Sequence, residues 1–248
     1  MAGAAAIAAS RAVASETLTK IEALSGDRFR AGAREFSLSD IAAPSPYDLR
    51  RAHEPYFKDA REVLETLIRD NAVTLLAEGG PDRWGVTPVV AKLAGDALTL
   101  QERVVAQGAA RVDPQTDDHV LIDRLLHLED EARKERRGLW RLDDYRVFDA
   151  ANAWGAVDGF NLVEGRVEAA AERKGRVYLN FGADYREDFT VTATAGRARR
   201  WRAGGLDLLE IGALGARLRA RGFVKPINGP SIELRHPKQL EALSPPRS

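Results

Sequence analysis

The pattern of apolar residues changes its period near residue 54, and this change limits the folds that the chain can adopt. Before that point apolar and polar residues alternate, which predicts short strands over residues 17–23, around residue 29 and over residues 35–41. Two prolines in the segment AAPSP then exclude a longer strand. From residue 54 the apolar residues recur at spacings of three and four, which predicts an amphipathic helix over residues 54–70.

The same two periods alternate through the next part of the chain. Strand patterns return over residues 72–77 and 86–93, separated by the turn GGPDRWG. Two further helices are predicted over residues 99–108 and 121–137, each closed by a glycine. Three strands, a helix, two strands and two helices indicate an α+β barrel rather than a doubly wound parallel sheet. We expect this barrel to occupy residues 16–141.

The chain after residue 156 has strand patterns with little helix between them. An Asn-Gly pair at residues 228–229 is a strong hairpin signal, and a short helical stretch is expected near residues 208–214. This pattern predicts a second, small mainly-β barrel of OB type over residues 157–243. We expect a linker at 142–156, a disordered tail or leader remnant at 1–15 and a tail at 244–248. The strands are predicted over residues 160–169, 176–181, 188–193, 217–224 and 231–234.

The composition excludes several classes of protein. The 37 basic and 37 acidic residues balance, which argues against a uniformly basic protein that coats nucleic acid. The two parts of the chain differ in charge: residues 1–156 carry 21 basic and 26 acidic groups, whereas residues 157–243 carry 15 basic and 11 acidic groups. No cysteine is present, which excludes disulfides, thiolate zinc sites and thiol nucleophiles. Arginine outnumbers lysine, which indicates either anion recognition or a GC-rich genome; we favour the genome.

The alanine-rich N-terminus bears on localisation. Its apolar stretch at residues 2–9 is too short to span a bilayer, so no membrane span is predicted. The short apolar stretch fits a leader remnant, but a leader normally begins with basic residues and none precedes Arg11. A disordered tail is therefore the alternative. We expect a periplasmic or secreted protein in the first case and a cytoplasmic one in the second.

Several segments of the first domain resemble the staphylococcal nuclease (thermonuclease) family in order and spacing. The resemblance covers most of residues 16–141 and implies a five-stranded OB-like barrel with three helices. The C-terminal part resembles, more loosely, an OB-type extension found behind some bacterial nuclease-like domains. The segments that carry the first resemblance are SGDRF (25–29), FSLSDIAAP (36–44), EPYFKDARE (54–62), DRWG (82–85), LQERVVAQGAARV (100–112) and LEDEARKERRGLW (128–140).

The family resemblance implies calcium-dependent phosphodiester hydrolysis, which needs two Asp on the metal, a Glu base and two Arg on the phosphate. Of these five groups the chain retains only the first Asp, as Asp27, a residue that is also favoured simply for closing a turn. The other four positions hold Ala42, Ser45, Ser37 and Val86. A single carboxylate does not hold calcium firmly. We therefore expect no catalytic residues and no cofactor, with calcium relevant only if the domain is a divergent nuclease.

Asp40 is the nearest candidate to replace the missing second metal carboxylate. It precedes Ala42 by two residues, which places it on the same face of a strand but roughly 6.5–7 Å away. Recruiting it by a shift of register would misplace Pro44, so we do not expect it to serve.

Two surface segments are candidates for nucleic-acid binding. Arg83 and Trp84 match the family position of a basic residue and an aromatic beside the nucleotide pocket, although Trp84 could instead cover the core. The run GRARRWR (196–202) interleaves arginine with an aromatic, as single-stranded nucleic-acid sites do, but it also fits a surface loop with Trp201 packed down. The candidate residues of this second segment are Arg197, Arg199, Arg200, Trp201 and Arg202.

These observations predict a catalytically inactive nuclease-like protein that acts as a binding or scaffolding module. Its partner would be a protein or a single-stranded nucleic acid, and the sequence sets no oligomeric state. The alternative is a divergent calcium-dependent nuclease that hydrolyses DNA or RNA.

Overall fold

The computed structural model describes residues 11–12, 16–47, 53–184 and 186–243. The chain divides into two compact units, Met1–Asp144 and Tyr145–Ser248, which we call unit 1 and unit 2. The tail expected at 244–248 and most of the one expected at 1–15 lie outside the described residues. Arg11–Ala12 is the exception, since it forms the short strand β1. Within the described part of the chain, no helix is long and apolar enough to cross a bilayer.

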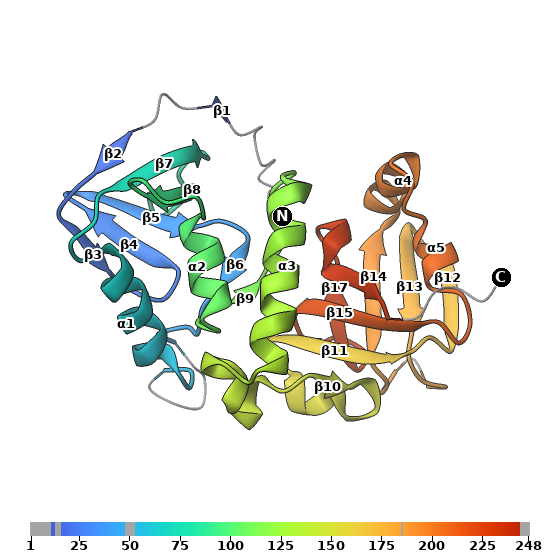
Figure 1. The fold of residues 1–248 in the computed structure, drawn as a ribbon. Helices are drawn as coiled ribbons and strands as arrows, with labels where there is room; N and C mark the ends of the chain where they lie inside the picture. The colour runs from blue at the N-terminus through green and yellow to red at the C-terminus, as the bar shows by residue number, and fades with distance from the viewer. Residues whose placement is uncertain (1–10, 13–15, 48–52, 185, 244–248) are drawn as a thin grey trace. The chain divides into compact units, whose positions relative to one another are not determined.

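Unit 1 is built on a curved sheet that nearly closes into a barrel (Figure 1). The strand order is β1-β7-β8-β5-β4-β3, with β2 also paired to β7, and only β5 and β8 run parallel. Lys20, at φ 55°, divides the strand predicted over residues 17–23 into β2 and β3, which pair with different neighbours. The strands are β2 (Thr17–Leu18), β3 (Ile21–Ala23), β4 (Arg28–Ala31), β5 (Arg34–Leu38), β7 (Val73–Glu78) and β8 (Val86–Leu93).

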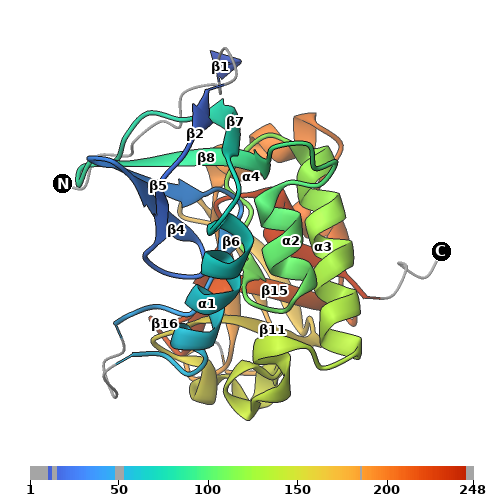
Figure 2. The ribbon, with the colours of Figure 1, turned by 60° about the vertical axis from the view of Figure 1, so that its left-hand side comes forward.

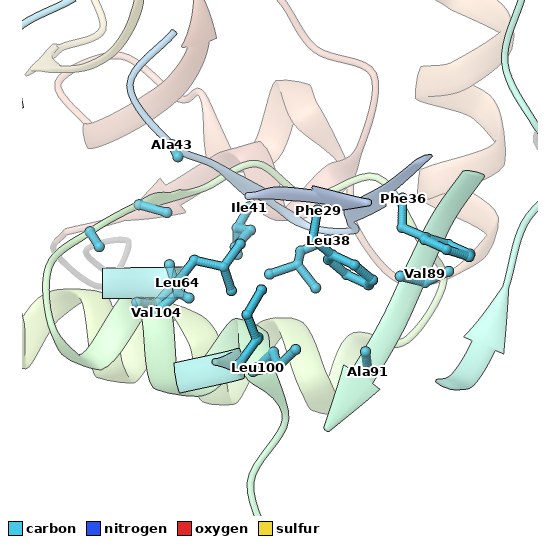
Figure 3. Close-up of a cluster of buried hydrophobic side chains, with 14 of the residues drawn as sticks. Phe29, Phe36, Leu38, Ile41, Ala43, Leu64, Val89, Ala91, Leu100 and Val104 are labelled. Atoms are coloured by element: carbon cyan, nitrogen blue, oxygen red, sulfur yellow. The ribbon is translucent and has the colours of Figure 1, made fainter. Parts of the chain in front are cut away.

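Three helices cover this barrel, as predicted: α1 (Phe57–Ile68), α2 (Leu100–Ala106) and α3 (His119–Lys134). The helix α2 begins with a capping box between Thr99 and Glu102, and it packs beside α3 (Figure 2). The core between helices and sheet includes the stacked rings of Phe29 and Phe36, whose centres are 5.1 Å apart (Figure 3). A short 3-10 helix, η1 (Gly138–Arg141), follows α3.

A separate two-stranded ribbon, β6 (Ile41–Ala42) and β9 (Arg111–Val112), carries residues of the candidate site. The sequence predicted one strand over residues 35–41, but the structure divides this segment into β5 and β6. The division falls at Asp40, whose φ of 64° is not a strand conformation.

Unit 2 is mainly β and contains two sheets. One sheet has the order β10-β11-β15-β18 and the other β12-β13-β14-β17-β16. β11 pairs antiparallel with β15 and β14 pairs parallel with β17, while the helices lie between β14 and β15 in the chain. The elements are β10 (Phe148–Asp149), β11 (Phe160–Arg166), β12 (Ala169–Arg173), β13 (Arg176–Asn180), β14 (Thr190–Thr194), α4 (Ala195–Ala203), α5 (Leu208–Ile211), β15 (Arg217–Phe223), β16 (Lys225–Pro226), β17 (Pro230–Glu233) and β18 (Leu240–Ala242), with 3-10 helices η2 (Asp143–Tyr145), η3 (Ala150–Ala156) and η4 (Pro237–Gln239).

Most of the segment predicted as a linker at residues 142–156 is part of unit 2. β10 pairs in parallel with β11, and four side chains from this segment are buried in the core of the unit. The segment is polar overall, which suggested a connector, but four of its apolar residues face the core, while Trp154 is exposed. The buried residues are Phe148, Ala150, Ala153 and Ala156.

The arginine-rich run after β14 is a helix, α4, and not the surface loop considered from the sequence. The Thr194 side chain caps the helix by accepting a hydrogen bond from the Arg197 amide, and alanine and arginine are strong helix formers. The hairpin signal at Asn228-Gly229 is confirmed, since these residues lie in the loop that joins β16 to β17.

Candidate functional site

Asp27 lies in the turn between β3 and β4 and links this turn to the segment after β6. Its carboxylate accepts a hydrogen bond from the Ser25 hydroxyl at 2.6 Å and one from the Ala43 amide at 3.0 Å. Burial raises the pKa of Asp27, and the hydrogen bonds from Ser25 and Ala43 only partly oppose this effect. The neighbouring Gly26 leaves no room for a side chain, because a Cβ there would lie 2.8 Å from the Cβ atoms of Ala43 and Ala60. These contacts give the Ser-Gly-Asp turn a structural role.

The four other positions to which the resemblance assigns catalytic groups hold alanine, serine and valine. Ala42 lies in β6, directly across from Arg111 in β9. Ser37 lies in β5, across from Arg28, and Val86 is buried at the start of β8. The fifth position, Ser45, offers its backbone amide to a carboxylate that comes from another part of the chain.

That carboxylate belongs to Glu54, and together with Arg111 it forms an ion pair that the sequence did not reveal. The Oε2 atom of Glu54 accepts the Ser45 amide at 3.0 Å and lies 3.5 Å from the Arg111 guanidinium. Only 4% of the Arg111 side chain is exposed, so its guanidinium is a buried cation in the strand across from Ala42. An arginine inside the apolar run GAARV was the available signal, because a buried arginine requires an acidic partner.

Asp40 is fully buried and does not lie beside Asp27 as a second metal ligand. Its left-handed backbone turns the carboxylate toward the segment before α3. There it accepts the amides of Gln115 and Thr116 at 2.8 and 2.9 Å and the Thr116 hydroxyl at 2.7 Å. The placement expected from strand periodicity, on the same face as Ala42, is therefore wrong, because the strand ends before Asp40.

Arg83 and Trp84 form an exposed pair in the turn between β7 and β8. The Trp84 side chain is 71% exposed, and the Arg83 guanidinium carbon lies 3.9 Å from the centre of its ring. The Asp82 carboxylate fixes the turn by accepting the amides of Trp84 and Val86. Trp84 therefore does not cover the core, and one face of its ring is stacked on a cation.

The second candidate segment is divided by α4 between core and surface. Trp201 is 9% exposed and belongs to the core of unit 2, so its ring is not available to stack on a base. Arg197 is paired with Glu233 at 3.0 Å and Arg202 with Asp207 at 2.7 Å. Arg199 and Arg200 are exposed and have no ion-pair partner among the described residues.

Unit 1 thus combines a nearly closed barrel with three helices, the fold expected of a nuclease-like OB domain. Residues 35–142 match a family model described as "Staphylococcal nuclease homologue". This region of the chain is therefore similar to staphylococcal nuclease homologues, and Asp27 precedes the matched residues. No curated protein matches the chain.

Proposed function

We propose that the protein is a non-catalytic, nuclease-like binding module. The observation that carries the proposal is the state of Asp27, the one retained carboxylate of the family set. Both of its oxygens are engaged by the protein, and its raised pKa disfavours the charged form that a metal requires.

The donor set at this position does not fit calcium, which takes six to eight oxygen ligands. Among the described residues no group of three or more acidic or histidine side chains is arranged to hold a metal ion. Glu54 supplies a second carboxylate in the region, but it is paired with Arg111 and bonded to the Ser45 amide. At Ala42, where the resemblance implies a carboxylate, the residue directly across is the cation Arg111. A cation at this position opposes the binding of a metal ion.

The Arg83–Trp84 pair supports a role in binding single-stranded nucleic acid. A free indole face stacks on any base, and an adjacent guanidinium attracts phosphate. Because Asp82 holds the turn in place, little ordering would be needed when a ligand binds. This pair is the feature of unit 1 that favours nucleic acid over a protein partner.

A cleavage assay tests the loss of catalysis. We expect the purified protein to leave single-stranded DNA and RNA intact with calcium or with a chelator, and Asp27→Ala to behave in the same way. Calcium-dependent cleavage that Asp27→Ala abolishes would contradict the proposal.

A binding assay tests the role of the Arg83–Trp84 pair. We expect Trp84→Ala to weaken the binding of a labelled oligonucleotide, measured by fluorescence anisotropy, by roughly tenfold, the effect of losing one stacked base. Trp154→Ala is the matched control, since Trp154 is another exposed tryptophan, 56% exposed, and lies in unit 2. Equal binding by Trp84→Ala and the parent protein would remove nucleic acid as the ligand of this turn.

A further inference from the structure

Unit 2 brings together two basic segments that are distant in sequence. The first is RKGR at residues 173–176, at the tip of the hairpin formed by β12 and β13. The second is the arginine run of α4. The Ala195 amide at the start of α4 donates to the Gly175 carbonyl at 2.8 Å, and Arg176 is paired in the sheet with Thr194, the cap of the helix. Figure 1 shows α4 beyond the ends of β13 and β14.

The guanidinium groups of the two segments meet at one carboxylate. Oε1 of Glu233 lies 3.0 Å from the Arg197 guanidinium and 3.6 Å from that of Arg176. Arg200 follows Arg197 by three residues and therefore lies on the same side of α4. Two cations that share one anion leave a net positive charge at the junction.

Four further cations lie in the same two segments, and we define the basic surface as these four residues with Arg176 and Arg197. The four are exposed and have no ion-pair partner among the described residues. Apart from the basic surface and Glu233, residues 157–243 carry nine basic and ten acidic side chains. The net positive charge of this part of the chain therefore comes from the basic surface. The four residues are Arg173, Lys174, Arg199 and Arg200.

An aromatic ring lies on the same face of the sheet. Val177 and Leu179 are in the core, so Arg176 and Tyr178 of the same strand are on the opposite, outer face. Tyr178 is half-buried, and the residues paired with it on the neighbouring strands are small, Ala171 and Thr192. Small neighbours leave the ring accessible from the side.

We propose that the basic surface and Tyr178 bind single-stranded nucleic acid, with the cations on the phosphates and the tyrosine ring against a base. The inference rests on the proposed binding function and assigns it a site in unit 2. Charge alone would also suit an anionic membrane, but Trp201, the one large apolar side chain of α4, is buried in the core, so α4 has no apolar face for a bilayer.

The test is anisotropy of the full-length protein with a labelled oligothymidylate of about 20 nucleotides, titrated between about 50 and 200 mM NaCl. Each phosphate contact to a single strand contributes about 0.7 to the slope of log K against log salt, so four unpaired cations predict a slope near −3. Arg199→Ala/Arg200→Ala should reduce the slope by about 1.4 and weaken binding roughly 25-fold at about 0.1 M salt. Tyr178→Phe should retain binding, and Tyr178→Ala should weaken it without a change in slope.

Lys58→Ala/Arg61→Ala is the matched control, because these two exposed cations lie close together on α1 of unit 1. Parental affinity and slope in Arg199→Ala/Arg200→Ala would overturn the inference. If Trp84→Ala alone then abolished binding, the proposed function would stand with its ligand on unit 1. Binding to phosphatidylserine vesicles and not to the oligonucleotide would assign the basic surface to membranes, and binding to neither would overturn it outright.

Discussion

Asp40 offers the sharpest test of how unit 1 is held together. Its carboxylate accepts three hydrogen bonds from Gln115 and Thr116 and so fixes the segment that leads into α3. Asp40→Ala would remove all three, and a hydrogen bond to a charged group is worth about 1.5–3 kcal/mol before non-additivity is considered. Alanine also tolerates the left-handed backbone poorly, at a cost of about 1–2 kcal/mol. Because the three bonds share one carboxylate and are not additive, we expect unit 1 to lose less than the sum of these terms, about 4 kcal/mol of stability.

Urea unfolding followed by circular dichroism measures this loss. Each unit has its own core, so the data should be fitted with two transitions. With an m value of about 2 kcal/mol/M, the midpoint of unit 1 should fall by about 2 M while that of unit 2 stays in place.

Two further variants separate the sources of the effect. Asp40→Asn keeps one carbonyl acceptor and tolerates the backbone, so it should lose only about 1–2 kcal/mol. Asp70→Ala is the control, because Asp70 is exposed and should change stability by no more than about 0.5 kcal/mol. A loss below about 1 kcal/mol for Asp40→Ala would refute the reasoning.

Three other outcomes are expected. Because burial raises the pKa of Asp27, the ionised form costs stability as the pH rises above the ordinary pKa of 3.8. Asp27→Asn should therefore be at least as stable as the parent near about pH 7 and lose any advantage at a pH below that ordinary pKa. Urea titrations across pH measure this difference. Calcium at about 10 mM should shift the melting temperature of unit 1 by less than about 1 °C in calorimetry, and a larger rise would reveal a calcium site. Trp201→Ala should destabilise unit 2 by about 3–5 kcal/mol, whereas Trp84→Ala should change unit 1 by no more than about 0.5 kcal/mol in the same measurement.

The regular parts of the fold could be predicted from the sequence because their periodicity is strong. The helix predicted over residues 54–70 contains α1, and the strand predicted over residues 86–93 is β8. The errors fall where one residue adopts an unusual backbone. Lys20 and Asp40 both have positive φ, and neither is a glycine that would have marked the break.

The candidate sites were harder to predict, because their contacts join distant segments. Spacing along the chain gives no sign that Glu54 reaches Ser45 and Arg111, or that Arg176 and Arg197 share a carboxylate. The arginine run is visible in the sequence, but Trp201 is buried because the run forms the helix α4. The sequence does not mark where this helix begins, because its cap, Thr194, fits the end of a strand equally well.

The parallel pairing of β10 with β11 decides where the chain can be divided. A fragment that starts at residue 157, the boundary suggested by composition, would lack β10 and the buried Phe148, and would expose an edge of β11 and part of its core. A fragment that starts at residue 145 keeps both. The compact unit of the C-terminal half therefore begins within what composition alone suggests is a connector.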